Sequence, residues 1–185
     1  PFSVLRYEIN TEGDSFRCAF DRATQALLFC VRVQMELLQY PWSPEVLALP
    51  GMGEIRSLLQ ERQGRGGKSS EAVVWRGPRV RMGVHCARDY AVERHKLTGA
   101  LQASGSGLNL ANEVESCASG GQILVTRNAA DKCKSEASVF HLLLSPLGIY
   151  SLKSGPVPLY QAQPATGPLS LSLIHISEPT RPYWI

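Results

Sequence analysis

The chain has 185 residues, of which 44% are apolar and 19% charged, so it is long enough for one globular domain with a substantial core. Its formal net charge of +3 is small, and Arg76, Arg79 and Arg81 punctuate a predicted strand instead of forming a basic stripe, which argues against nucleic-acid binding. Five widely spaced cysteines without a CxxC pair favour small core residues in a reducing compartment, and no run approaches the roughly twenty apolar residues that span a bilayer, so we expect no membrane contact.

Two short strands joined by an acidic turn open the predicted fold. Apolar and polar residues alternate from Leu5 to Asn10 and again from Ser15 to Phe20, which is the period of half-buried strands. Gly13 lies where the chain must reverse and can take the positive φ of a tight turn. Asp14 follows it, and a carboxylate at a strand end suits a hard cation. On the turn alone, an ordinary turn-forming role for Asp14 is the more common interpretation.

A long amphipathic helix and a less regular region follow. Asp21 is a plausible N-cap, and apolar residues recur at three-and-four spacing through Gln39. The segment Gly51–Ser70 is polar and glycine-rich, which predicts a surface insertion. Residues Arg79–His85 alternate as a strand, with His85 expected to be structural, and Ala87–Ser104 is predicted to be a polar loop.

The second half of the chain predicts alternating helices and strands. The expected elements are a helix over Leu108–Cys117 that stops at Gly120-Gly121, a buried strand at Gln122–Val125, a brief helix from Thr126 to Cys133, and a terminal hairpin formed by Val139–Leu144 with Gly148–Leu152. This βαβ order indicates an α/β fold, an α+β sandwich with one sheet and helices on a single face.

The two ends of the chain are expected to be atypical. Residue 1 is proline and a strand follows within a few residues, so we expect that a preceding element is missing. Leu171–Arg181 resembles the translated sequence of a transposon adapter used in sequencing libraries. We therefore expect a partial domain over residues 1–162 and a disordered tail over 163–185 that is non-native from about residue 169.

Three groups of residues in a fixed order carry a family resemblance. They are Thr11–Asp14 in the hairpin, Trp75-Arg76-Gly77 with the strand Arg79–His85, and Asn109–Leu124 in the second half. Together they resemble the class III nucleotidyl cyclase catalytic domain, most closely the receptor-type adenylate cyclases of kinetoplastid flagellates, over roughly residues 5 to 162. The resemblance implies a ferredoxin-like βαββαβ fold whose first strand is missing here.

The resemblance also implies a chemistry. In the family, the ribose 3′-hydroxyl attacks the α-phosphate of a nucleoside triphosphate and pyrophosphate leaves. Two divalent ions, Mg²⁺ or Mn²⁺, are held by two aspartates and shield the growing charge. The second aspartate corresponds to Asp14, and the first belongs to a strand that would precede residue 1, so this piece alone is expected to be inactive. Asn109 corresponds to the asparagine that orients the ribose, although by itself it could be a helix-start cap.

Three positions depart from the family pattern. Asn10 stands where adenylate-forming members have the lysine that reads the purine, and Gln102 stands where they have its partner aspartate. Both amides can hydrogen-bond a purine edge, so the choice of ATP over GTP is not fixed by this pair, although ATP is favoured. Glu113 stands where the family has the arginine that stabilises the transition-state phosphate. An acid about 4 Å from a phosphate oxygen costs on the order of several kcal/mol, a rate penalty of roughly a thousandfold or more.

Family sites form between two cyclase domains. Retaining the metal turn while losing the lysine and arginine is the pattern of the metal-donating half of a homodimer or heterodimer that binds a nucleoside triphosphate. A catalytically silent cyclase-homology module for dimerisation and regulation is the alternative. In either case the resemblance implies a cytoplasmic domain, such as that of a membrane-anchored receptor cyclase.

Overall fold

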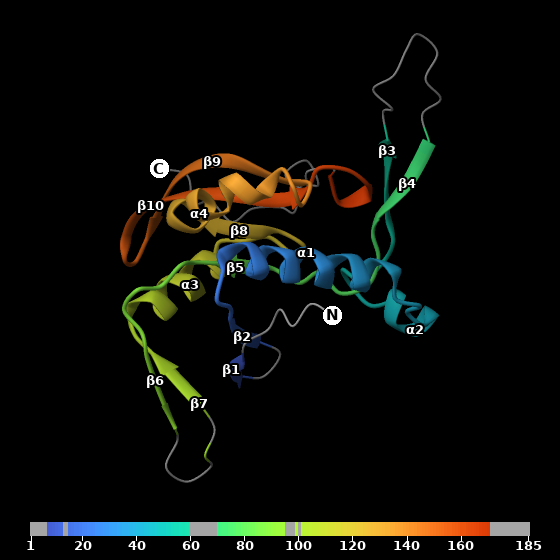
Figure 1. Cartoon of the computed structure of the whole chain (residues 1–185). Helices are drawn as coiled ribbons and strands as arrows, with labels where there is room; N and C mark the ends of the chain where they lie inside the picture. Colours follow the sequence, from blue (N-terminus) through green and yellow to red (C-terminus); the bar gives the residue numbers. More distant parts are fainter. Residues whose placement is uncertain (1–6, 13–14, 60–69, 95–98, 100, 171–185) are drawn as a thin grey trace.

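A computed structural model of the chain describes residues 7–12, 15–59, 70–94, 99 and 101–170 (Figure 1). The helices are α1 (Ala23–Gln39), α2 (Pro44–Leu47), α3 (Ser106–Ser116) and α4 (Arg127–Ala137), and a 3-10 helix, η1, covers Pro168–Ser170. The strands are β1 (Tyr7–Glu12), β2 (Ser15–Ala19), β3 (Ile55–Leu59), β4 (Ser70–Trp75), β5 (Met82–Val84), β6 (Ala91–Arg94), β7 (Leu101–Ser104), β8 (Ile123–Thr126), β9 (Leu142–Leu152) and β10 (Gly155–Pro164).

A mixed four-stranded sheet forms the centre of the described structure, in the order β5-β8-β10-β9. Strand β5 runs parallel to β8, whereas β10 is antiparallel to both β8 and β9. The expected α/β class is therefore confirmed. The strands β1 and β2 form a separate two-stranded sheet, and the ferredoxin-like strand order with a missing first strand stays a prediction.

The helices cover both faces of this sheet. Ile123 and Val125 pack into a core with α1 and α4, whereas Leu124, which alternates with them, packs into a second core with Val114 and Ala118 of α3 and the turn that follows it. The expectation of helices on a single face is therefore wrong. Strand β8 shows why helices lie on both faces. All of its residues are buried, and a strand that is covered on both faces is apolar on both.

Helix α1 agrees with its predicted range and buries the expected three-and-four stripe, including Leu27, Cys30 and Val31. Its N-cap is Arg22, not Asp21, because the Gln25 side chain reaches back and accepts the Arg22 backbone N–H at 3.2 Å. Burial raises the pKa of the Cys30 thiol to about 12, so it stays protonated. None of the five cysteines forms a disulfide, and Cys133 is also buried, which confirms the core role for Cys30 and Cys133.

Two segments expected to be irregular contain hairpins instead. Strand β3 lies within the region predicted to be an insertion and pairs with β4, which begins at the last residue of that region, Ser70. Residues 60–69 lie outside the described residues. Strands β6 and β7 pair within the predicted loop Ala87–Ser104. The exposed strand β6 gave little hydrophobic periodicity because all of its residues face solvent.

The predicted terminal hairpin is also wrong, because both of its segments belong to the single strand β9. Gly148 has φ +115 and lies where the β9–β10 register shifts, so it forms a bulge that bends the strand without ending it. The chain reverses later, at Lys153 and Ser154, and β10 then pairs along the whole of β9. Pro146 is tolerated because β9 is an edge strand of the described sheet.

The expected domain boundary at residue 162 falls inside β10, which continues to Pro164. The side chain of Gln163 donates to the carbonyl of Ser170 in η1 at 2.9 Å. Residues 171–185, most of the expected tail, lie outside the described residues. Within the part of the chain that is described, no helix is both long and apolar enough to cross a bilayer.

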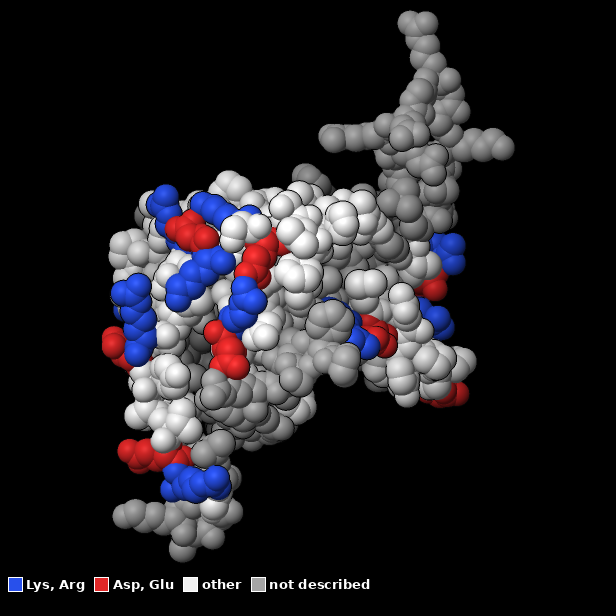
Figure 2. All heavy atoms as spheres, viewed as in Figure 1, with Lys and Arg blue, Asp and Glu red and all other residues white. Residues whose placement is uncertain are grey.

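Charged side chains of both signs mix on the face shown in Figure 2. Ion pairs join Arg22 to Glu136, Lys134 to Asp131 and Arg127 to Asp131 on and around α4. This face therefore carries no large field of a single sign, which agrees with the small net charge of +3.

We predict that Gly83→Ala destabilises the domain by about 1–3 kcal/mol. A Cβ at Gly83 would lie 2.5 Å from the Glu115 nitrogen and 2.8 Å from the Ala111 carbonyl oxygen, both backbone atoms of α3 that cannot move independently. Gly53→Ala is the matched control, because its nearest neighbour would be 3.7 Å away. Urea unfolding measures both, and an equal loss in the two variants would contradict the prediction.

Candidate active site

Helix α3 carries the residues that the resemblance assigns to the ribose and the phosphate. Asn109 lies in its first turns with an exposed side chain, and Glu113 follows one turn later on the same face. The helix is capped by Gly105 without a side-chain hydrogen bond, so Asn109 is not a helix cap. Its side chain is therefore free of a capping role and points away from the core.

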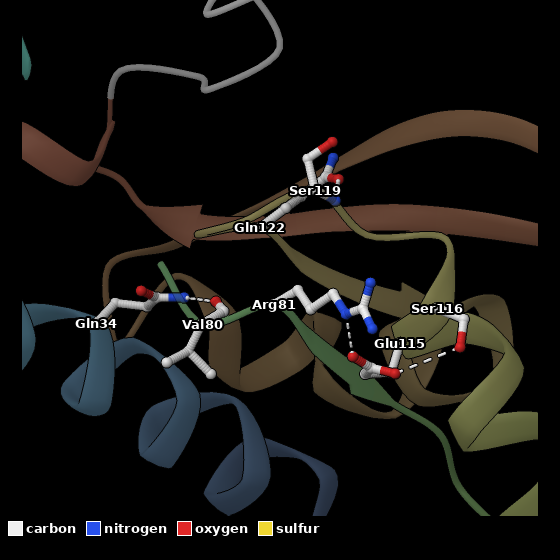
Figure 3. A network of polar contacts seen from close by, with 7 residues as sticks. All are labelled: Gln34, Val80, Arg81, Glu115, Ser116, Ser119 and Gln122. Carbon is white, nitrogen blue, oxygen red and sulfur yellow. Dashed lines mark hydrogen bonds and ion pairs between the residues drawn. The ribbon is translucent and has the colours of Figure 1, made fainter. Parts of the chain in front are cut away.

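The position of α3 is set by a close approach to β5. Gly83 allows the α3 backbone at Ala111 and Glu115 to lie against the strand, since a side chain at this position would overlap it. Arg81 forms an ion pair with Glu115, which Figure 3 shows from close by. This contact joins Arg81, the residue before β5, to the last turn of α3, the helix that carries Asn109 and Glu113.

 The ion pair thus helps to hold the last turn of α3, and with it the exposed face of the helix, against the sheet.

The loop that follows α3 forms hydrogen bonds with the segment before β5 and with the start of β5. The Val80 carbonyl accepts the Gly121 N–H at 3.1 Å and the Gln34 side-chain amide at 2.7 Å, and the Met82 N–H donates to the Gln122 carbonyl at 2.9 Å. The two sequence motifs Arg79–His85 and Asn109–Leu124 therefore interlock through their own backbones and side chains. Residues of both motifs therefore contribute to the packing of α3 and its following loop against the segment before β5.

Glu113 has a structural partner that the sequence did not indicate. Its Oε2 accepts both the backbone N–H and the hydroxyl of Ser154, each at 3.0 Å, in the turn between β9 and β10. The backbone hydrogen bond from Ser154, helped by its hydroxyl and by Lys153, lowers the pKa of the Glu113 carboxyl below its usual value. Glu113 is therefore ionised at neutral pH and is held on the β9–β10 turn.

The two amide positions lie on strands that contact each other. Asn10 in β1 pairs with Arg17 in β2, and Gln102 in β7 pairs with Glu93 in β6. Strand β1 packs beside β7, so the two strands that carry the candidate purine-reading residues are neighbours. The orientation of these two side chains is outside the described part of the structure, and their role stays a prediction.

The acidic hairpin is joined to α3 by a contact that sequence reasoning missed. Arg17 Nε donates to Asn112 Oδ1 at 3.2 Å, across 95 positions in the chain. Asn112 lies three residues after Asn109, so this bond ties β2 to the helix that carries the candidate ribose residue. No local pattern in the sequence could have indicated the bond, since it depends on tertiary placement.

The metal prediction is not tested by the described residues. The paired residues Glu12 and Ser15 flank positions 13 and 14, and Asp14 itself lies outside the described residues. Among the residues that are described, no group of three or more His, Cys, Asp and Glu side chains could hold a metal ion. Metal binding by Asp14 therefore stays a prediction.

His85 has the structural environment expected of it. Its Nδ1 lies 3.0 Å from the Thr126 hydroxyl at the end of β8. Partial burial, and then the positive charge of Lys132, lower the pKa of His85 below its usual value, so the ring is neutral at pH 7.

The mixed sheet covered by helices on both faces matches the fold of solved cyclase catalytic domains. The family model described as "Adenylate and Guanylate cyclase catalytic domain" matches residues 3–161. The chain belongs to this family, whose members use divalent metal ions.

Two relatives that are named as adenylate cyclases agree with this assignment. The chain is 38% identical over 117 residues to an adenylate cyclase of Neurospora crassa, covering 63% of this chain and 5% of that protein. It is 28% identical over 151 residues to receptor-type adenylate cyclase B of Leishmania donovani, covering 77% of this chain and 11% of that protein. The chain thus spans only a small part of the length of these relatives.

Solved structures support the fold. A Trypanosoma brucei adenylate cyclase, analysed in its monomeric state, superposes with a TM-score of 0.61 at 23% identity, covering 84% of this chain and 70% of that one. The likeness to kinetoplastid adenylate cyclases that the motifs indicated is therefore confirmed at the level of family and fold.

We predict that Glu113→Ala speeds hydrogen exchange of the Ser154 backbone amide, because that amide loses its acceptor. Glu113→Gln keeps an oxygen acceptor and should leave exchange much slower than in Glu113→Ala. Exchange measured by NMR checks this, with Glu36→Ala in α1 as the control. Unchanged exchange at Ser154 in Glu113→Ala would contradict the contact.

We also predict that the domain loses stability as the pH falls below 6.5. The pKa of His85 is lowered in the folded state, so the unfolded chain binds the proton more readily and acid favours unfolding. The loss begins near the unfolded pKa of 6.5 and ends below the folded pKa, with at most about 1.4 kcal/mol per pH unit from this one proton. Urea unfolding at several pH values should show a flatter profile for His85→Gln, and an identical profile would contradict the prediction.

Proposed function

We propose that this domain is the metal-donating half of an asymmetric cyclase pair that forms a 3′,5′-cyclic nucleotide and pyrophosphate, with ATP as the favoured substrate. Family membership supplies the reaction class, and the Neurospora and Leishmania relatives are named as adenylate cyclases. The assignment to one half of a pair rests on residues of this chain.

The observation that carries the proposal is the fixed acid on α3. Glu113 stands at the position of the family arginine and is held by two hydrogen bonds from Ser154. A phosphate bound over this face would meet the negative charge of a carboxylate that two hydrogen bonds orient on the β9–β10 turn. We infer that productive nucleotide binding uses the acidic hairpin of this chain and the cationic residues of its partner.

The acidic hairpin would hold the metal ions in the composite site. Bound Mg²⁺ or Mn²⁺ would supply charge stabilisation for the triphosphate and activate the attacking hydroxyl. In this chain Asp14 would be a ligand, and the bond from Arg17 to Asn112 would keep the hairpin at a fixed place beside α3. Asn109 of this chain would belong to the second, incomplete site of the pair.

Exposed apolar side chains offer a surface on which the proposed partner could bind. Phe16 on β2 is 69% exposed, Tyr90 just before β6 is 56% exposed and Val92 on β6 is 38% exposed. These residues lie on or next to hairpins that pack together through β1 and β7. A second cyclase domain, identical or different, would cover them.

A catalytically silent module that dimerises and regulates is the second candidate. Glu113 favours this candidate as well. A domain that has lost catalysis could also carry an acid at the position of the family's phosphate-stabilising arginine. For either candidate we propose a cytoplasmic location in a longer protein, because the relatives of this chain include a receptor-type adenylate cyclase of Leishmania donovani that is much longer than this chain.

The two candidates are distinguished by complementation. The partner is a class III cyclase domain that keeps its purine-reading lysine and phosphate-stabilising arginine and has both metal aspartates replaced by alanine. Because the resemblance places the first metal aspartate before Pro1, the experiment uses the parent coding sequence. We predict that the mixture forms cyclic AMP from ATP while neither domain does so alone.

Two variants assign the roles within that mixture. Asp14→Ala should lower the activity at least about a hundredfold, because metal-ion charge stabilisation is worth several kcal/mol. Asn109→Ala should leave it unchanged, because this residue would face the incomplete site. No product above the partner alone would favour the silent module. Loss with Asn109→Ala but not with Asp14→Ala would reverse the assignment.

A further inference from the structure

A buried amide oxygen on α1 lacks a partner within the described structure. Gln34 is only 2% exposed, and its Nε2 donates to the Val80 carbonyl at 2.7 Å. This bond fixes the orientation of the carboxamide, and Figure 3 shows the oxygen on the side away from Val80. Gln34 Oε1 is buried there without a hydrogen-bond partner among the described residues. Buried polar atoms in native proteins are nearly always paired with protein groups or with ordered water.

Gln34 lines a small pocket where α1 meets the end of β10 and η1. The cavity volume is about 20 Å³, and its walls include Val31, Gly121, Gln161, Gln163 and Leu169. A volume of this size holds one water molecule but not a larger ligand. Among the described residues, no Asp, Glu, Lys, Arg or His lines it, so this part of the pocket suits a neutral occupant.

Two of the glutamines that line the pocket, Gln161 and Gln163, belong to a chain of hydrogen-bonded side chains with unused hydrogen-bonding capacity. Gln122 Nε2 donates to Gln161 Oε1 and Gln161 Nε2 donates to Gln163 Oε1, each at 3.0 Å, and Gln163 Nε2 donates to the Ser170 carbonyl at 2.9 Å. A carboxamide has two N–H donors and an oxygen with two lone pairs. Gln161 and Gln163 therefore each keep a donor and an acceptor position for a further partner.

We propose that the pocket binds a single ordered water molecule that donates one hydrogen bond to Gln34 Oε1 and makes a second to the carboxamide of Gln161 or Gln163. The water satisfies the buried oxygen and joins α1 to the end of β10. Since Gln34 also holds Val80, which precedes β5, the water completes a polar connection between α1, the segment before β5 and β10. The proposal does not depend on cyclase activity.

The test uses the unmodified chain first. A high-resolution crystal structure should show water density within hydrogen-bond distance of Gln34 Oε1 and of a Gln161 or Gln163 side-chain atom. In solution, NMR should show a cross-relaxation signal between a long-lived water and the Gln34 side-chain amide protons. An empty pocket, or a protein donor on Gln34 Oε1, would overturn the proposal.

A variant removes the proposed acceptor at similar volume. In Gln34→Met the long-lived water should disappear, as judged by the loss of its density and of its cross-relaxation signals with the amides of Gln161 and Gln163. Gln39→Met, at an exposed position of the same helix, is the matched control and should retain both. Persistence of the water in Gln34→Met would show that Gln34 Oε1 does not bind it.

Discussion

The contact on which the rest of the structure depends is the close packing of α3 against β5 at Gly83. Without a side chain at this position, the backbone of α3 reaches the strand, and the ion pair between Arg81 and Glu115 closes the contact at its edge. Close packing of backbone on backbone leaves little freedom for sliding, because neither surface can change shape. The face of α3 that carries Asn109 and Glu113 is therefore presented in one orientation.

The same contact involves two of the sequence motifs on which the family resemblance rests. Residues of the two longest motifs, such as Arg81, Gly83 and Glu115, take part in this packing. Function depends on other positions of the same helix. Glu113 lies two residues before Glu115, yet its partner is the β9–β10 turn. We propose that it takes the position of the family arginine, whose charge is opposite.

The sequence predicted the elements whose signal is local and strong. Helix α1 shows several turns of apolar periodicity, and β8 is a continuous apolar run, so both were found close to their observed bounds. Gly148 was misread as part of a hairpin because a glycine in a strand can mark either a turn or a bulge, and only the pairing partner decides between them. The Ser154 and Asn112 contacts were not predictable, since they join residues 41 and 95 positions apart.

The central claim is that Glu113 stays bound to Ser154 when the domain works, so that nucleotide is held through the acidic hairpin of this chain and the cations of a partner. A crystal structure of the paired domains with a non-cyclisable ATP analogue tests this claim most directly. The account predicts a triphosphate beside the hairpin of this chain, with Glu113 still accepting both hydrogen bonds from Ser154. A triphosphate bound over the Asn109 face of this chain, with Glu113 released from Ser154, would contradict it.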